Sequence, residues 1–250
     1  MKPPWILALT AIFVVTSGAP GWSKGRKPAA PPELPGMAAI PAGEFLMGSR
    51  PDDPEIYEVE RPKEQPQHKV WVDAFAIDRH EVTNAEYSRF DLEHGRDPRL
   101  RCPECPVTNV SWFEARAYCA HLQKRLPTEA EWEKAAKGGA TASPKPLADY
   151  AWYLSNADGI AHPVGKKKPN QYGLYDMLGN VREWTADWFD AGYYARSEPK
   201  NPPGPTAGTR RVERGGAFFL FKEGVNATIR YNHPAEFRLY FLGFRCARDV

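Results

Sequence analysis

The sequence carries little net charge and has no hydrophobic run long enough to cross a membrane. It has 33 lysines and arginines against 31 aspartates and glutamates, a net charge of +2. A nucleic-acid or anionic-membrane partner would call for a strongly basic surface, so this balance argues against both. The main apolar run, Trp5–Val15, has about eleven residues, whereas a spanning helix needs roughly 20. We therefore expect no nucleic-acid partner and no transmembrane span in the mature chain.

Metal-binding and redox motifs are also scarce. The only CxxC is Cys102-Pro-Glu-Cys105, and neither a second CxxC nor an HxxxH accompanies it. A zinc site needs such a second ligand pair, and a redox CxxC normally comes with a thioredoxin-like βαβ pattern, which is lacking here. The six histidines show no metal-ligand spacing: His68, His80, His94, His121, His162 and His233. We interpret each of them as a surface or core residue.

The N-terminus has the features of a secretory signal peptide. Lys2 precedes the apolar run, and small residues and proline follow it. We expect residues 1–23 to be removed and the protein to be exported, to the periplasm, the extracellular space or the ER lumen; the alternative is a buried N-terminal helix. Residues 24–36 are rich in proline and charge and predict an extended tether. The folded domain is expected to span residues 37–250.

Three helix starts carry the capping-box pattern, in which a hydroxyl residue is followed three positions later by glutamate. They are Thr83–Glu86, Ser111–Glu114 and Thr128–Glu131. We expect the second helix to run to about Lys124 and to bury Tyr118 and Leu122. The third helix should end near Lys137, where Gly138 can adopt the left-handed C-cap.

Strand signals are fewer, and they are separated by long irregular stretches. The candidates are Phe45–Gly48, Lys69–Ile77, Arg211–Leu220 and Gly243–Arg245. In the second of them, one set of residues alternates with another as in a half-buried strand: Val70, Val72, Ala74 and Ala76 alternate with Trp71, Asp73, Phe75 and Ile77. With 20 glycines and 25 prolines and no internal repeat, the chain is predicted to be one α+β domain with much irregular structure.

Export makes disulfides plausible, since secreted proteins fold in an oxidising compartment. The sequence has four cysteines, and four thiols allow three pairings. We favour a local structural bridge, Cys102–Cys105, with zinc binding and redox activity as the alternatives. That leaves Cys119 to pair with Cys246, which would close a loop of about 127 residues and contribute up to about 5 kcal/mol in the chain-entropy model.

Several longer motifs occur in a fixed order along the chain. They are MAAIPAGEFLMGS at 37–49, DRHEVTNAEY at 78–87, PVTNVSW at 106–112, KRLPTEAEWE at 124–133, YGLYDMLGNVREW at 172–184, RGG at 214–216 and GFRCAR at 243–248. Over about 215 residues, this set resembles the formylglycine-generating enzyme (sulfatase-modifying factor) family. The resemblance implies an elaborated C-type-lectin-like α+β domain, and it supports the Cys119–Cys246 pairing.

The resemblance also implies a structural Ca²⁺ ion. Its ligands would be the side chains of Asp176 and Glu183 and the carbonyl oxygens of Gly179 and Val181. Carboxylate and carbonyl oxygens in a tight turn suit this hard cation. The alternative is that the two acids cap turns or pair with a neighbour such as Arg182. A second family Ca²⁺ site, which the shortness of its loop disfavours, would fall on Asn156, Ala157, Asp158 and Ile160.

The resemblance breaks down at the catalytic positions. Enzymes of this family oxidise a cysteine of a sulfatase peptide to formylglycine with O₂, and they hold Cu(I) with two thiolates shortly after the RGG motif. In this sequence the two positions are Leu220 and Val225. Soft Cu(I) needs soft thiolate ligands, so we expect no copper and assign no catalytic residue.

The C-terminal loop mixes aromatic and polar side chains, a composition typical of ligand grooves. The candidate groove residues are Phe218, Phe219, Phe221, Asn226, Arg230, Tyr231 and His233. The alternative is that the phenylalanines belong to the core and the polar residues form a solvated rim.

We interpret the chain as an exported, Ca²⁺-stabilised domain that binds a peptide, protein or small molecule, or serves as an accessory domain, without thiol–copper oxidase activity. One alternative is an oxidoreductase of the same family that uses other metal ligands, either formylglycine-generating or acting on a small molecule. Another is a cell-envelope assembly factor held by the proline-rich tether.

Overall fold

The computed structural model describes residues 35–52, 61–94, 102–140 and 144–250. The predicted signal peptide and residues 24–34 of the predicted tether lie outside these ranges. Within them, no helix is long and apolar enough to cross a membrane.

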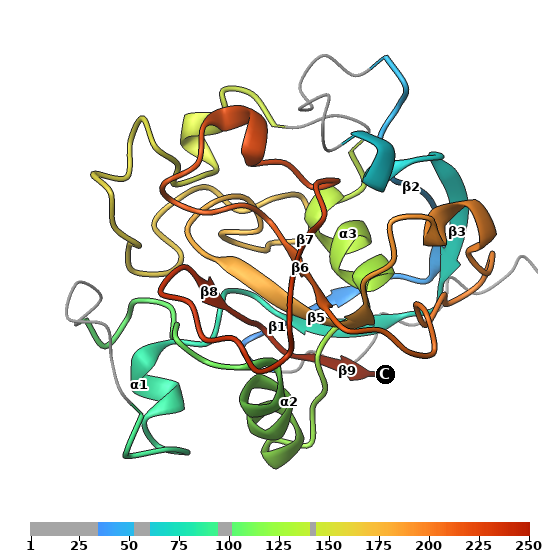
Figure 1. Ribbon diagram of the computed structural model, residues 1–250. Helices are drawn as coiled ribbons and strands as arrows, with labels where there is room; N and C mark the ends of the chain where they lie inside the picture. Colours follow the sequence, from blue (N-terminus) through green and yellow to red (C-terminus); the bar gives the residue numbers. More distant parts are fainter. Residues whose placement is uncertain (1–34, 53–60, 95–101, 141–143) are drawn as a thin grey trace, which may run out of the picture. The chain divides into compact units, whose positions relative to one another are not determined.

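A three-stranded sheet joins the two ends of the folded domain. Strand β4 (Phe75–Asp78) lies between β1 (Met37–Ile40) and β9 (Ala247–Asp249) and pairs antiparallel with both. The last strand of the chain therefore lies in the same sheet as the first strand of the domain, on the other side of β4 (Figure 1). Strands β2 (Gly43–Met47) and β3 (His68–Val72) form a separate antiparallel pair.

A four-stranded sheet lies at the centre of the C-terminal half. In spatial order its strands are β7 (Tyr231–His233), β6 (Arg211–Arg214), β5 (Arg182–Trp188) and β8 (Leu242–Gly243). The β5–β8 pair is parallel, whereas β5–β6 and β6–β7 are antiparallel. Because β5 has neighbours on both sides, nearly all of its side chains are buried, which hides any alternation in the sequence.

All three predicted capping boxes are present. They begin α1 (Asn84–Tyr87), α2 (Trp112–His121) and α3 (Glu129–Lys137). Gly138 forms the C-cap of α3 with φ +58°, as expected for a left-handed residue. Short 3₁₀ turns complete the helical content: η1 (Arg61–Glu64), η3 (Leu147–Asp149), η4 (Tyr193–Arg196) and η5 (Lys222–Gly224).

The prediction for the second helix was wrong at its C-terminal end. Helix α2 stops at His121 instead of near Lys124. Tyr118 is buried as expected, but Leu122 caps the helix and is 42% exposed. The chain leaves the helix at Leu122. Tyr118 and Leu122, although four residues apart, therefore do not lie on one buried helix face.

Two predicted strands were too long. The segment Lys69–Ile77 is divided between β3 and β4 at Asp73 and Ala74. There the Asp73 backbone N–H donates to the side chain of Asn201 (2.8 Å), so it does not continue a strand ladder. The strand that starts at Arg211 ends at Arg214, because Gly215 and Gly216 have φ angles of +95° and +82°.

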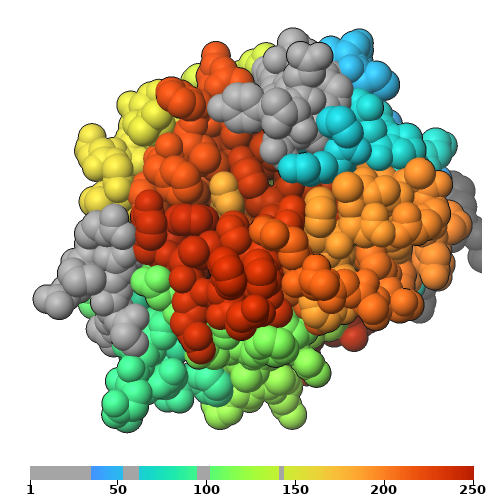
Figure 2. Space-filling model, in the orientation of Figure 1, coloured from blue at the N-terminus to red at the C-terminus, as the bar shows by residue number. Residues whose placement is uncertain are grey.

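The hydrophobic core has two main parts. One packs Phe75, Ile77 and Tyr194 around Trp132 of α3. The other surrounds α2 and includes Tyr87, Tyr118, Trp184 and Phe244. The C-terminal third of the chain, coloured orange to red, covers most of the face seen in Figure 2.

Three fully buried arginine–glutamate pairs link the elements of the core. Arg214 bonds to Glu133, Arg230 forms a fork with Glu129 (2.7 and 2.8 Å), and Arg245 forms a fork with Glu183 (2.7 and 2.7 Å). All six residues have at most 2% of their surface exposed. Breaking such a pair by removing one partner typically costs about 3–5 kcal/mol, so these pairs fix the loops that carry them.

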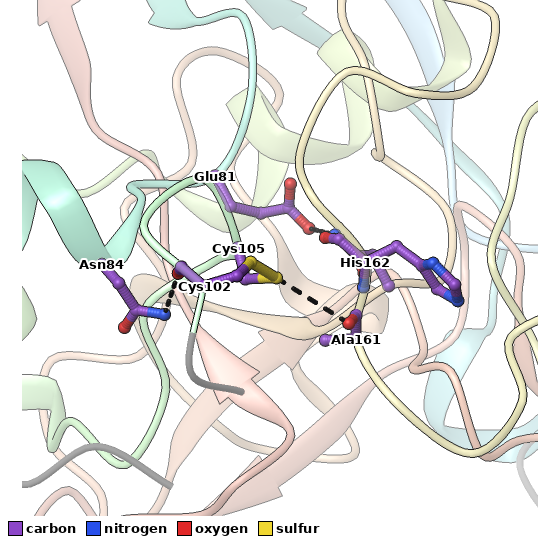
Figure 3. The surroundings of a disulfide bond; sticks show 7 residues. Glu81, Asn84, Cys102, Cys105, Ala161 and His162 are labelled. Carbon is purple, nitrogen blue, oxygen red and sulfur yellow. Dashed lines mark hydrogen bonds between the residues drawn. A yellow bond between two sulfur atoms is a disulfide. The ribbon is translucent and has the colours of Figure 1, made fainter. Parts of the chain in front are cut away.

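Both predicted disulfides are confirmed. Cys119 of α2 is joined to Cys246, just before β9, across 127 residues of sequence. Cys102 and Cys105 form the local bridge. Figure 3 shows its surroundings: the Asn84 side chain donates to the Cys102 carbonyl (3.1 Å), and the Cys105 sulfur lies 3.9 Å from the Ala161 carbonyl oxygen. The local bridge therefore connects the start of α1 with the loop around residue 161.

Candidate functional site

The RGG motif makes a tight turn that brings residues 214–216 against residues 224–225. A Cβ atom on Gly216 would lie 2.5 Å from the Gly224 carbonyl oxygen and 3.0 Å from the Val225 Cα. Those distances are too short for any side chain, and φ is +82°. The glycine therefore allows the 217–225 loop to fold back onto the end of β6 (Figure 1).

The structure places Leu220 and Val225, the two positions of the family's copper-binding cysteines, in one apolar cluster. Val225 is 1% exposed, and the cluster also contains Leu178 and Ala151. All four cysteines of the sequence lie in the described part of the chain and are paired, so none is a free thiol. The loop that follows RGG therefore offers hydrocarbon where the family has sulfur.

The seven predicted groove residues do not all face one space. Phe218 is buried against Ala161 and Val181, and Arg230 is fully buried in its pair with Glu129. Phe221 is 62% exposed.

Three more of the predicted groove residues, Asn226, Tyr231 and Phe219, make contacts within the protein itself. The Asn226 side-chain oxygen accepts from the N–H groups of Thr228 and Ile229. Tyr231 donates its hydroxyl to the Gly224 carbonyl (3.0 Å), and Phe219 packs edge-on against Phe241 (4.9 Å between ring centroids).

Three ionisable residues, Arg182, Glu213 and His233, meet on the central sheet, on the strands β5, β6 and β7. The buried Glu213 carboxylate accepts from His233 Nδ1 (2.6 Å) through one oxygen and lies 3.4 Å from Arg182 through the other. The Arg182 guanidinium lies 3.5 Å from the centroid of the Tyr231 ring and 5.1 Å from that of Phe241, close enough for cation–π attraction. His233 keeps 25% of its side chain exposed.

The sequence analysis did not identify Arg182 or Glu213 as members of this group. Glu213 pairs with Tyr231 in the β6–β7 register, and Arg182 begins β5. Only the strand pairing brings the three together, because their spacing in the sequence follows no local period. The one available signal was the charged position between the asparagine and glutamate of GNVREW.

The predicted Ca²⁺ ligands lie in a tight, buried turn. Asp176 is 2% exposed and has φ +55°; one carboxylate oxygen accepts from the Gly165 N–H (2.6 Å), and the other has no partner among the described residues. Glu183 is different, because Arg245 binds both of its oxygens and Trp132 donates to one of them (2.8 Å). Of the two acids, Asp176 has the free oxygen that a hard cation would use.

Glu81, which the sequence analysis did not select, belongs to the same acidic group. One of its oxygens accepts from Asn180 (3.1 Å), and the other has no partner in the described ranges. Burial, and then the charge of Asp176, raises the pKa of Glu81 well above its usual value. Glu81, Asp176 and Glu183 lie close enough to Arg245 for its charge to act on all three. A divalent cation would compensate this excess of negative charge, although no three acidic, histidine or cysteine side chains of the described chain converge as metal ligands.

In the second predicted Ca²⁺ site, the Asn156 side chain and the Ala157 carbonyl form hydrogen bonds with nearby residues. The Asn156 side chain accepts from the Tyr153 N–H and donates to the Ala151 carbonyl. The Ala157 carbonyl accepts from the Ile160 N–H and lies 3.0 Å from His162 Nε2. Asp158 and Ile160 are exposed.

A cavity of about 380 Å³ lies beside the loop that follows Val225. Its walls come from the end of β2, the C-terminal end of α3, residues 168–178 and residues 226–228. Asn226 is the one predicted groove residue in this wall. The volume lies within the range of small-molecule sites.

Comparison with known proteins agrees with this architecture. The formylglycine-generating enzyme of Bos taurus is 32% identical, over 93% of this chain and 79% of that protein. A Mus musculus protein named inactive C-alpha-formylglycine-generating enzyme 2 is 29% identical, over 86% of each chain.

Solved structures also resemble the chain over most of its length. Treponema denticola variable protein 1 has a TM-score of 0.72 at 30% identity, over 86% of this chain and 95% of that one. PvdO from Pseudomonas aeruginosa has a TM-score of 0.74 at 27% identity, over 86% and 94%. The predicted fold class is thus confirmed. The family model described as the sulfatase-modifying factor enzyme 1-like domain matches residues 24–250, and the chain therefore belongs to that family.

Proposed function

We propose that this protein is an exported, Ca²⁺-stabilised member of its family that does not carry out thiol–copper oxidation and acts as a binding or accessory domain. The observation that supports this most directly is the apolar pair Leu220 and Val225 at the copper positions, together with the pairing of every cysteine.

The ligand preference of Cu(I) is the chemical reason for this proposal. Cu(I) prefers thiolate ligands, and a buried leucine and valine offer it no lone pair. Reduction of a disulfide would not supply the missing thiols, because Cys119 and Cys246 are fully buried in the other core cluster, beside α2. Cys102 and Cys105 belong to the loop near residue 161.

Relatives of this chain include both a protein named as an enzyme and a protein named as inactive. One is named as a formylglycine-generating enzyme and another as an inactive one. Membership of the family therefore leaves the activity of this chain to be decided by its own residues, and these favour binding.

The surface around Arg182 and Tyr231 supports a binding role. It combines the Arg182–Glu213–His233 group with partly exposed aromatic rings, including Phe237 stacked on His233 (5.8 Å between ring centroids). Arg182 and Glu213 are buried, so the exposed aromatic rings would make the contacts, and aromatic side chains dominate the energetics of many recognition surfaces. We propose a peptide, protein or small molecule as the ligand class of the domain.

We also propose that the protein binds Ca²⁺ and is exported. Arg245 binds both oxygens of the predicted ligand Glu183, so we propose Glu81 in its place. Asp176 and Glu81 each have one buried oxygen without a partner among the described residues, and with the carbonyls of Gly179 and Val181 they would hold Ca²⁺. The ion would supply charge compensation and hold the turn. The two disulfides agree with export, because such bridges persist mainly outside the cytosol.

The test is a copper and activity assay on the purified, disulfide-bonded protein. Cu(I) affinity is measured by competition with a chelator, and formylglycine formation is measured on a cysteine-containing sulfatase peptide, with the bovine enzyme as positive control. We expect neither tight Cu(I) binding nor product. The double variant Leu220→Cys with Val225→Cys is the matched control and should gain Cu(I) affinity. Product formation by the unmodified protein would refute the proposal, and stoichiometric iron or copper in the purified protein would favour the oxidoreductase alternative.

A further inference from the structure

The cavity beside residues 226–228 has a lining of mixed polar and apolar side chains, and its polar inner wall is the part formed by Ser49 and Thr228. Ala136 of α3, Leu174, Met177 and Leu178 supply hydrocarbon surface. Ser49 and Thr228 contribute hydroxyl groups to the same lining. A cavity of about 380 Å³ has the size of a small-molecule site, and its many polar and charged side chains favour a polar ligand.

The polar inner wall contains hydrogen-bonding groups without partners. Ser49 is 1% exposed, and its hydroxyl has no hydrogen-bond partner among the described residues. Glu64 does not itself line the cavity but is fully buried beside Ser49 and Thr228, which do, and neither of its carboxyl oxygens has a hydrogen-bond partner within the same ranges. The Ser49 and Thr228 hydroxyls lie close enough to influence the Glu64 carboxyl. Leaving such groups unsatisfied costs about 1–3 kcal/mol each, so a ligand that donates hydrogen bonds here would recover that cost.

The charges around Glu64 favour a cationic donor. The positive charge of Arg214 acts on Glu64, but Arg214 already bonds to Glu133 and to the carbonyls of residues 227–229. Glu133 itself adds negative charge near Glu64. Burial raises the pKa of Glu64 to about 7, which shows how weakly its ionised form is compensated. An ammonium group placed there would compensate the carboxylate directly.

The cavity lining includes four cationic residues, Arg50, Lys137, Lys145 and Lys168, and two of the exposed ones form only weak surface pairs. The side chains of Arg50 and Lys168 are 59% and 64% exposed. Arg50 lies 4.0 Å from the exposed Asp52, and Lys168 lies 2.7 Å from Asp149. Exposed pairs of this kind contribute at most about 1 kcal/mol, so the carboxylate of a ligand can compete for both cations.

From this arrangement we infer that the cavity binds a small zwitterion, a compound with an ammonium group and a carboxylate group. The ammonium group lies against Ser49 and Glu64, and the carboxylate lies toward Arg50 and Lys168. This inference rests on the proposed binding function and names a ligand class for it.

Isothermal titration calorimetry with simple probes tests the inference. Glycine, 4-aminobutanoate and 6-aminohexanoate differ in the distance between their charges, while hexylamine and hexanoate carry one charge each. We expect at least one amino acid of this series to bind about tenfold more tightly than either single-charge probe. Equal affinities for all five probes, or no binding by any at millimolar concentration, would overturn the inference.

Variants assign the two ends of the ligand. Glu64→Gln keeps the side-chain shape and should weaken the amino acid about tenfold while leaving hexanoate unchanged. Arg50→Gln with Lys168→Gln affects only exposed side chains and should remove the advantage of the amino acid over hexylamine. The control is Glu198→Gln, an exposed residue outside the cavity lining, which should bind like the unmodified protein.

Unchanged affinity in a folded Glu64→Gln variant, or an equal loss in the Glu198→Gln control, would contradict the assignment. The copper assay is independent of these titrations. A protein that forms no formylglycine and binds no zwitterion keeps the proposed function and loses this inference. A protein that forms formylglycine loses the proposed function whatever the titrations show.

Discussion

Replacement of Arg245 by methionine should be among the most destabilising single changes in this protein. Arg245 is fully buried, binds both oxygens of Glu183 at 2.7 Å, and donates to the carbonyls of Asp78 (3.1 Å) and Tyr175 (3.0 Å). Its charge also stabilises the ionised forms of Glu81 and Asp176. Methionine would leave the buried carboxyl groups of Glu81, Asp176 and Glu183 without the guanidinium that faces them. Removing one partner of a buried pair costs about 3–5 kcal/mol, and we expect a loss of at least that size.

The measurement is urea unfolding followed by tryptophan fluorescence, for which the chain has eight tryptophans. The matched control is Arg238→Met, because Arg238 forms the same kind of fork with Glu114 (2.9 and 2.7 Å) but is 55% exposed. Exposed pairs contribute about 0–1 kcal/mol, so the control should lose little. If Arg245→Met lost no more free energy of unfolding than Arg238→Met, the reasoning about buried pairs in this fold would be wrong.

A double variant separates the pair from its surroundings. Arg245→Met combined with Glu183→Gln removes both charges, so it should be less destabilising than the sum of the two single variants, by about 1 kcal/mol or more. Strict additivity would show that Arg245 acts through the carbonyls of residues 78 and 175 instead of through Glu183.

Three further predictions concern other parts of the molecule. Replacing both cysteines of the Cys119–Cys246 bridge with serine should cost up to about 5 kcal/mol and lower the Tm much more than the same change in the Cys102–Cys105 bridge, whose loop is short. Glu64 has its pKa raised from 4.5 to about 7, so the folded protein keeps a proton that the unfolded chain releases between those pH values, and this group makes stability fall as the pH rises from 4.5 to 7. Glu64→Gln should remove up to about 3 kcal/mol of that fall, seen as a smaller decrease of Tm between pH 4 and pH 8. Chelation of Ca²⁺ should lower the Tm of the unmodified protein, and Asp176→Asn should abolish this Ca²⁺ dependence; an unchanged Tm on chelation would contradict the calcium proposal.

The sequence predicted the local features of the fold well, because their causes are local. A capping box needs only a hydroxyl residue and a glutamate three positions apart, and all three boxes formed. The left-handed cap at Gly138 likewise depends on one residue. The Cys102–Cys105 bridge joins residues three positions apart.

Apart from the Cys119–Cys246 bridge, the following features that depend on distant partners were missed. The break between β3 and β4 depends on Asn201, which lies 128 residues from Asp73. The Arg182–Glu213–His233 group exists only because β5, β6 and β7 are neighbours. Glu64 is buried because its carbonyl accepts from the Ser49 N–H (3.0 Å) and lies where Gly48 has no side chain. No period in the sequence carries such information.

The residues that hold this fold together are separate from those that would determine copper chemistry. Arg214, Arg230 and Arg245 stabilise the loops through buried glutamates, and none of these pairs involves Leu220 or Val225. In a buried cluster a cysteine behaves as a small hydrophobic residue, so leucine and valine can take its place in the packing while they remove the soft ligands. The Leu220→Cys and Val225→Cys double variant should therefore fold with a Tm lowered only by the lost methyl groups, at about 1 kcal/mol for each residue. A much larger loss would mean that the loop has been repacked around leucine and valine, and a gain of Cu(I) affinity at nearly unchanged Tm would show that stability and chemistry are independent at these two positions.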